Sequence, residues 1–423
     1  MIRLGSGGLK ALRGAGNKAS GAVSSKASEV SASLSERLAT AGFGKGGSRR
    51  SFKSALLALE AERRASSELA PEPSDEIRFS VSVRPVPKER ARIVSGGSGA
   101  FTPRRTSEFS AMMERAADEA MAGRAPFSGP VGGEIVFRMR IPPSWRASDR
   151  SAAADGELWP TMRPDQDNLV KAVLDAANGR LFVDDGQVCL LTVIKRYDEH
   201  PGVDVRIGPL RGESHRRASL RRRGASPRSD DFSPSSDFSG EIPELLDEVT
   251  FFVGGRVVPK ERPRVVSNGR VTFTPRRTSE FSGIVGRAAT AAMGVSEPFS
   301  GPVGGTFDFV LRIPPSWREE DRGLAAAGLI WPTMRPDQDN LAKAVLDSAN
   351  GRLFADDGQV CWLRVRKRYG DVPGVGVVIG RLSGEGHARA SRRMAKVSAA
   401  ASADAEAPCG RSGGAVHANG SVG

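Results

Sequence analysis

The stretch Arg163-Pro164-Asp165-Gln166-Asp167-Asn168-Leu169 decides how this chain can fold. Its two carboxylates stand two residues apart, so in extended backbone they share one face. Asn168 is expected to open a helix, which places Lys171 one turn beyond Asp167. That helix is expected to end at Asn178-Gly179, a sequence typical of a helix stop. The stretch therefore predicts an acid pair on a loop that leads directly into a helix.

The same stretch recurs 172 residues later as Arg335-Pro336-Asp337-Gln338-Asp339-Asn340-Leu341, with Lys343 in the place of Lys171. The same offset aligns residues 87–90 with 259–262, 102–109 with 274–281, 141–146 with 313–318, and 195–197 with 367–369. No insertion or deletion intervenes. Solenoid repeats are much shorter, so the pattern predicts a tandem duplication of one whole domain.

Each copy is expected to alternate strands and helices in the same order. A first strand (78–83; 250–253) leads through a basic Pro-rich loop and a short Phe-Thr-Pro strand to a helix near Thr106 or Thr278. An alternating strand (134–141; 306–313), a variable loop and the acid-pair helix follow. The Asp-Asp-Gly turn after that helix starts an apolar strand (188–195), and a last strand lies near 203–207. The order predicts an α/β or α+β fold, with two main helices and a small mixed sheet in each copy.

Composition divides the chain into five segments. We expect a basic, disordered arm at 1–76, a first domain at 77–210, a flexible linker at 211–248, a second domain at 249–382 and a disordered tail at 383–423. Residues 1–70 carry 12 basic and 5 acidic groups, which is typical either of disorder or of an organelle transit peptide. No apolar run approaches the ~20 residues of a membrane span. A soluble, intracellular protein is expected, with organelle targeting left open.

The net charge of +13 indicates a polyanionic partner, and much of the excess lies outside the two copies. Residues 211–229 carry 7 Arg and 1 Glu, for example. Basic arms attract phosphate without reading base sequence, although a solvated tail with no partner is the alternative. The three cysteines form no CxxC pair, which favours a reducing compartment. Neither a zinc site nor a histidine-based catalytic triad is expected.

The acid pair and the following turn together favour a divalent cation. Asp184 and Asp185 arrive on the turn where the chain doubles back toward the sheet, so each copy is expected to hold one complete site. Carboxylates without histidine suit Mg²⁺, with Mn²⁺ as the alternative. Such an ion binds phosphate oxygens, and Lys171 could offset negative charge or position the attacking water. The structural alternative is a helix cap at Asp165, with Asp175 as an ordinary ion partner of Lys171.

These motifs in their order resemble the RusA family of crossover-junction endodeoxyribonucleases, the Holliday-junction resolvases. The resemblance rests on the acid stretch, on Asn-Gly followed by Asp-Asp-Gly-Gln-Val, and on Lys195. Pro87-x-x-Arg90-x-Arg92 and Ile-Pro-Pro-Ser-Trp are also similar to the family. The likeness covers nearly all of 77–210 and 249–382. It implies a homodimeric, Mg²⁺-dependent nuclease that nicks opposing strands of a four-way DNA junction in recombination and repair.

The resemblance also implies roles for individual residues. The positions that match its essential acids and lysine are Asp165, Asp167, Lys171, Asp185, Asp337, Asp339, Lys343 and Asp357, with Asp184 and Asp356 as further metal ligands. The basic residues expected to contact DNA phosphates, or else to be plain surface charges, are Lys88, Arg90, Arg92, Arg104, Arg105, Lys260, Arg262, Arg264, Arg276 and Arg277. Trp145 and Trp317 could stack on a base or pack in the core.

The tandem arrangement departs from a family of single domains that dimerise. We expect the two copies to form an intramolecular pseudo-dimer, since the linker raises their effective concentration, with a homodimer of chains as the alternative. Branched DNA is the expected partner. Two other functions stay open: a nuclease for other branched or flapped DNA, and an architectural protein that holds junctions without cutting them.

Overall fold

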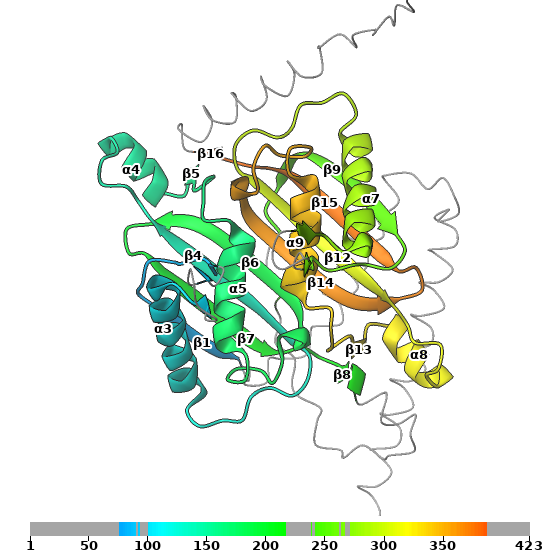
Figure 1. The fold of residues 1–423 in the computed structure, drawn as a ribbon. Helices are drawn as coiled ribbons and strands as arrows, with labels where there is room; N and C mark the ends of the chain where they lie inside the picture. The colour runs from blue at the N-terminus through cyan, green and yellow to red at the C-terminus, as the bar shows by residue number, and fades with distance from the viewer. Residues whose placement is uncertain are drawn as a thin grey trace, which may run out of the picture.

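The computed structural model describes residues 76–89, 92–93, 100–216, 238, 242–261, 264–266 and 271–386. The expected N-terminal arm, most of the linker and nearly all of the tail lie outside these residues. The described part consists of two copies of one mixed α and β unit, joined through a single eight-stranded sheet (Figure 1). The predicted mixed fold with two tandem units is confirmed. None of the described helices is long and apolar enough to cross a membrane.

The two copies contain the same elements in the same order. The first copy contains β1 (Ile77–Val81), β2 (Arg92–Ile93), β3 (Ala100–Phe101), α3 (Arg104–Met121), β4 (Val131–Arg140), α4 (Ala147–Ala154), β5 (Leu158–Trp159), α5 (Gln166–Ala177), the 3-10 helix η1 (Asp185–Gln187), β6 (Val188–Asp198), β7 (Gly202–Pro209) and β8 (Glu213–Ser214). The second contains β9 (Leu245–Gly254), β10 (Arg264–Val266), β11 (Val271–Phe273), α7 (Arg276–Met293), β12 (Val303–Arg312), α8 (Glu319–Ala326), β13 (Ile330–Trp331), α9 (Gln338–Ala349), η3 (Asp357–Gln359), β14 (Val360–Gly370), β15 (Gly374–Leu382) and β16 (Glu385–Gly386). The short helices α4 and α8 occupy the segment that was expected to be a variable loop.

The two copies meet at the centre of the sheet. Its strand order is β1-β7-β4-β6-β14-β12-β15-β9, so β6 of the first copy is hydrogen-bonded to β14 of the second. These two strands run antiparallel, with Ile194 opposite Trp362 and Leu190 opposite Arg366. Within each copy the pairs β4–β6 and β12–β14 are parallel, while the outer pairs are antiparallel. Main-chain hydrogen bonds between β6 and β14 therefore join the two copies into one continuous sheet.

Four helices cover one face of this sheet. Figure 1 shows α3 and α5 over the first half and α9 and α7 over the second, with α5 and α9 side by side at the centre. The buried residues of α3 recur every four positions from Phe109 through Met113 and Ala117 to Met121, which gives one apolar stripe along the helix. That stripe packs on α5 and on the apolar side chains of the sheet. The resulting core fixes the N-terminal end of α5, where the acid pair lies.

The C-terminal extension of each copy crosses to the other copy. β8 pairs with β13 of the second copy, and β16 pairs with β5 of the first. Trp331 Nε1 donates to the carbonyl oxygen of Arg211 at 2.9 Å, and Trp159 Nε1 donates to that of Ser383 at 2.8 Å. The units therefore extend beyond the expected ends at 210 and 382. Strands lie at 213–214, 245–248 and 385–386, within the ranges that were expected to be a flexible linker and a disordered tail.

The two tryptophans with alternative roles both pack against a core, with Trp317 buried and Trp145 half-buried. Trp317 is 6% exposed and meets the ring of Tyr369 edge-on at 5.3 Å between centroids. Trp145 packs against the first core and meets Tyr197 in the same way at 5.1 Å. Core packing is confirmed for Trp317, while Trp145 packs against the first core with part of its surface exposed.

Candidate functional site

The acid pair does not cap its helix through side chains. Asp165 is the residue before α5, with extended backbone (φ −71°, ψ 143°), and Asp167 lies in the first turn. Asn168 Nδ2 donates to Asp165 Oδ2 at 3.4 Å. Asp165 Oδ1 and Asp167 Oδ1 are buried and accept no hydrogen bond from any residue in the described ranges. The same holds at Asp337 and Asp339, so the helix-cap alternative does not account for these carboxylates.

The second acid pair lies on a turn that a side-chain network holds in place. Asp184 accepts from the backbone N–H of Gly186 at 2.9 Å, and Gln187 Oε1 accepts from the N–H of Asp184 at 2.8 Å. Gln187 Nε2 also donates to the carbonyls of Phe127 and Gly129. The network recurs at the equivalent turn of the second copy. This capping box presents Asp185, or Asp357 in the second copy, beside the start of the central strand.

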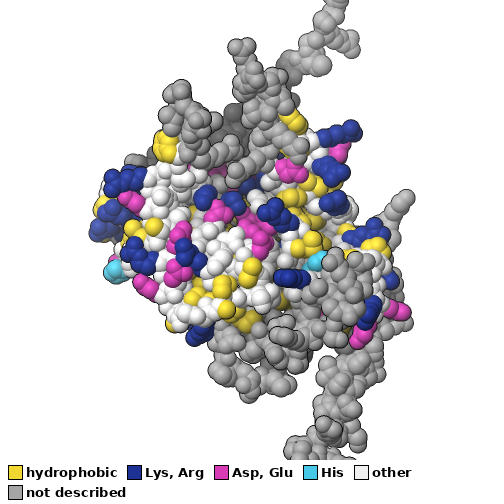
Figure 2. Space-filling view, turned by 60° about the horizontal axis from the view of Figure 1, so that its bottom comes forward, with side chains coloured by type: hydrophobic (Ala, Val, Ile, Leu, Met, Phe, Trp, Pro, Cys, Tyr) yellow, Lys and Arg dark blue, Asp and Glu magenta, His cyan; other side chains and the backbone are white. Residues whose placement is uncertain are grey.

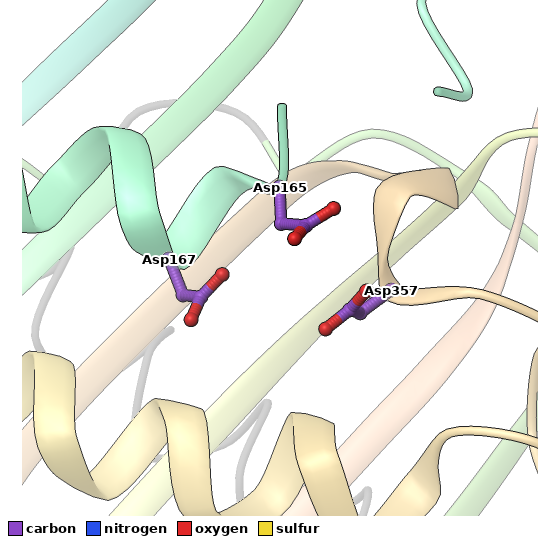
Figure 3. A group of neighbouring side chains, drawn as sticks. All are labelled: Asp165, Asp167 and Asp357. Carbon is purple, nitrogen blue, oxygen red and sulfur yellow. The ribbon is translucent and has the colours of Figure 1, made fainter. Parts of the chain in front are cut away.

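The acids gather across the two copies rather than within one. Oxygens of Asp165, Asp167 and Asp357 all lie within 4.8 Å of one another, and Figure 3 shows the three carboxylates directed toward one space. A second group unites Asp337 with Asp184 and Asp185. The expectation that the acid pair and the Asp-Asp turn of one copy form one complete site is wrong. The antiparallel pairing of β6 with β14 brings the turn of each copy to the acid pair of the other.

The lysine that follows each acid pair also crosses to the other copy. Lys171 Nζ lies 2.9 Å from Asp339 Oδ2, and Lys343 forms an ion pair with Asp167. The described structure therefore holds two equivalent sites. We define site A as Asp165, Asp167, Lys343, Asp356 and Asp357, and site B as Asp337, Asp339, Lys171, Asp184 and Asp185.

Asp175 acts as an ion partner, as its structural alternative proposed. Lys171 Nζ lies 3.4 Å from Asp175 Oδ1, and Lys88 Nζ lies 2.9 Å from Asp175 Oδ2. The same chain of charges runs through Lys343, Asp347 and Lys260. Lys88 and Lys260, both expected at DNA, therefore lie next to the sites and are engaged by these carboxylates.

Crowding of the carboxylates raises their pKa values. Burial, together with Asp165 and Asp167, raises the pKa of Asp357 to about 7. Burial, Asp337 and Asp339 raise the pKa of Asp185 to about 6. Each site therefore concentrates negative charge that either a proton or a cation must offset.

The pKa values of Lys171 and Lys343 are raised as well, because the neighbouring carboxylates favour the charged ammonium groups. Burial alone would lower the pKa of Lys171, but the carboxylates of Asp339 and Asp175 together offset this and raise it. The unpartnered oxygens and the purely carboxylate donor set fit a hard divalent cation.

Two further lysines lie behind the sites, and sequence reasoning gave them no role there. Lys195 and Lys367 are fully buried at the central strands. Lys195 Nζ donates to carbonyls of its own acid loop and to that of Gly358 in the other copy. One feature of the sequence could have indicated this role, namely a lysine at the same position of an apolar strand in both copies. A charge within such a strand is more readily interpreted as a surface residue.

Four of the remaining basic residues lie on the surface. Arg104, Arg105, Arg276 and Arg277 are exposed at the starts of α3 and α7. Arg104 and Arg276 each pair with a glutamate four residues on, at 2.6 Å. Arg92 and Arg264 lie in short strands, while Arg90 and Arg262 lie outside the described residues. Figure 2 shows acidic side chains near the centre of one face with lysines and arginines around them.

Comparison with known proteins agrees with this duplicated architecture. The family model described as endodeoxyribonuclease RusA matches residues 82–208 and again 254–380. A relative from Bacillus subtilis (strain 168), the "Uncharacterized protein YqaN", is 34% identical over 143 residues, which is 33% of this chain and 99% of the relative. Both family matches contain the acid pair, the lysine and the Asp-Asp turn of their copy. The chain therefore belongs to the RusA endodeoxyribonuclease family and carries two copies of the family's domain in one polypeptide.

Proposed function

We propose that this protein is a divalent-metal-dependent endonuclease that nicks four-way DNA junctions in recombination and repair. The observation that carries the proposal is the meeting of an acid pair from one copy with an Asp-Asp turn and a lysine from the other. Membership of an endodeoxyribonuclease family supports phosphodiester cleavage. Clustered carboxylates repel phosphate, so a protein that only holds DNA would gain nothing from them.

The residues of site A suggest a division of labour. Asp165, Asp167 and Asp357 would hold Mg²⁺, or Mn²⁺ in its place. The bound ion would supply positive charge to the scissile phosphate and ease the loss of a proton from water. Lys343 brings an ammonium group to the Asp167 carboxylate, where it can stabilise the extra negative charge that develops on the phosphate. Site B would act in the same way through Lys171.

The arrangement of the sites fits a substrate with two equivalent strands to cut. Sites A and B are related by the repeat, and the central β6–β14 ladder and the neighbouring α5 and α9 hold them in one body. A four-way junction offers two such strands in one substrate. We propose that the chain works as an intramolecular pseudo-dimer, in which the covalent link replaces dimerisation of separate chains.

The direct test is cleavage of a panel of four-way junctions, flaps and plain duplexes by the purified chain with Mg²⁺ or Mn²⁺. Paired nicks in the junction are expected, with little cutting of duplex. Asp167→Asn together with Asp339→Asn removes one acid from each site, and should abolish nicking while junction binding persists. Nicking by that double variant would overturn the proposed chemistry. Preferential cutting of flaps would replace junctions with other branched DNA, and metal-independent binding without cutting would favour an architectural protein.

A further inference from the structure

Lys195 binds both copies through one nitrogen atom. Its Nζ donates to the carbonyl oxygens of Met162 at 3.1 Å and Pro164 at 3.3 Å, and to that of Gly358 in the other copy at 2.7 Å. The side chain has no exposed surface. Three carbonyl acceptors match the three N–H donors of an ammonium group, so every donor of Lys195 is used.

These carbonyls belong to the backbone that carries site A. Pro164 directly precedes Asp165, and Gly358 directly follows Asp357. Lys367 repeats the arrangement behind site B. Its Nζ donates to the carbonyls of Met334 at 3.0 Å, Pro336 at 3.1 Å and Gly186 of the first copy at 2.7 Å.

The backbones of the two copies are also in close contact at this point. A Cβ added to Gly358 would lie 3.2 Å from the carbonyl carbon of Met162 and 3.3 Å from the backbone nitrogen of Arg163. Gly186 has the same relation to Met334 and Arg335, at 3.1 and 3.3 Å. The same Cβ would lie 2.8 Å from Asp356 Oδ1 at Gly358 and 2.7 Å from Asp184 Oδ1 at Gly186, so a side chain there would disturb both the turn itself and the loop of the other copy. The loop and the turn are therefore held at a fixed separation from two directions.

We infer that Lys195 and Lys367 are positioning residues that assemble sites A and B, each by fixing the acid loop of one copy to the Asp-Asp turn of the other. The inference rests on the proposed function of the acid clusters as metal sites. Like charges in each cluster repel, so the turn needs an attachment that does not involve the carboxylates themselves. The lysines supply it from behind the ligands, out of reach of solvent and substrate.

An uncharged side chain could not replace this contact. An apolar residue would remove the donor from three carbonyls, of which that of Gly358 or Gly186 is bound in a buried contact, and unpaired buried acceptors are unfavourable. The planar guanidinium of arginine presents its donors in a flat fork, which does not match three carbonyls around one tetrahedral nitrogen. Lysine is thus the residue whose shape and donor count fit the position.

The test compares the two lysines in chains that retain one intact site. A chain with Asp337→Asn and Asp339→Asn keeps site A, and a chain with Asp165→Asn and Asp167→Asn keeps site B. Lys195→Met and Lys367→Met are each placed in both backgrounds. Mn²⁺ binding is measured by electron paramagnetic resonance on DNA-free protein, and junction nicking is measured separately.

In the chain that keeps site A, Lys195→Met should weaken Mn²⁺ binding about 10–100-fold more than Lys367→Met does, the range typical for residues that orient metal ligands. The order should reverse in the chain that keeps site B. A lysine that only stabilised the shared sheet would affect both sites equally, and equal effects would overturn the inference.

Two further results keep the test decisive. Lys195→Arg is the second variant if Lys195→Met fails to fold, because it keeps the charge but not the donor geometry, and it should show the same selective loss at site A, while Lys367→Arg should act on site B. Parent chains that bind Mn²⁺ but nick no branched DNA would reject the proposed function. The selective pattern of Mn²⁺ binding would still decide the role of the lysines.

Discussion

Lys171 Nζ of the first copy lies 2.9 Å from Asp339 Oδ2 of the second, and Lys343 makes the reciprocal ion pair with Asp167. Each copy thus gives its acid pair to one site and its lysine and Asp-Asp turn to the other. Neither copy contains all the parts of a site. The duplication in this chain therefore produces two sites only when the copies are paired.

The lysines of the ion pairs are expected to act on the transition state rather than on metal binding. Replacing both Lys171 and Lys343 with Gln should lower the nicking rate about 10²–10³-fold, the loss typical for one electrostatic donor at a reacting phosphate or carbonyl. The metal concentration that gives half-maximal nicking should not rise, since each lysine competes with a cation for the same carboxylate. Single-turnover kinetics across a Mg²⁺ series measures both quantities. An unchanged rate constant at saturating metal would exclude this role.

The buried charges of the second copy offer a stability test with an internal control. Asp308 is 5% exposed and accepts from Arg366 Nε at 2.9 Å and Arg368 Nη2 at 2.8 Å. Asp308→Val should lower the free energy of unfolding by about 3–5 kcal/mol, because it removes the buried carboxylate that both Arg366 and Arg368 contact. The first copy has Val136 and Ile194 in the places of Asp308 and Arg366.

Replacing Asp308 with Val and Arg366 with Ile, the residues of the first copy, should therefore restore most of the lost free energy of unfolding. Urea unfolding of Asp308→Val, alone and combined with Arg366→Ile, compares the two chains. A combined variant no more stable than Asp308→Val would show that the arginine charge is not the cause.

The central ladder should tolerate only one arginine at its middle pair. Arg364 Nε donates to Thr192 Oγ1 at 3.1 Å, and the two residues stand directly opposite each other. Thr192→Arg would face Arg364 with a like charge, so the melting temperature and the nicking rate should both fall. Adding Arg364→Thr exchanges the two residues and should recover most of the loss. Equal defects in the single and exchanged chains would indicate a steric cause instead.

The stability of the metal-free protein should depend on pH in a defined direction. Folding raises the pKa of Asp357 to about 7 and of Asp185 to about 6, from the ordinary value of 3.8 for an aspartate side chain. Between about pH 4 and 7 the folded state then binds more protons than the unfolded state, so stability falls as pH rises. Calorimetry in EDTA should show this contribution, and Asp357→Asn with Asp185→Asn should reduce it. Added Mg²⁺ should stabilise most at pH 8, where it replaces no proton.

Much of the fold could be predicted from the sequence because each motif occurs in both copies, so a pattern seen in one copy can be checked in the other. The helix expected at Asn168 begins two residues earlier, and its predicted stop at Asn178 is correct. Asp165, Asp167 and Asp357 are all among the predicted residues. Their grouping could not be predicted, because Asp185 and Asp357 occupy equivalent positions and spacing along the chain does not show which copy supplies the turn.

The crossing arms and the buried lysines show two other limits. The strand β8 has two residues, too few for an alternating pattern. One signal was present: Gly212-Glu213-Ser214-His215 recurs at the same offset as Gly384-Glu385-Gly386-His387, beyond the expected ends of both copies. Lys195 connects the two copies only through the carbonyl of Gly358, which lies 163 residues away along the chain.

The composition of the sites is tested most directly by two double variants that share one substitution. Asp167→Asn with Asp357→Asn removes two acids from site A and leaves site B intact. Asp167→Asn with Asp185→Asn removes two acids from the first copy and thereby damages both sites. On a four-way junction with each strand labelled, the first chain should still nick one strand of each pair, whereas the second should nick none. The opposite result, nicking by the chain with both substitutions in the first copy and none by the other, would contradict sites that are shared between the copies.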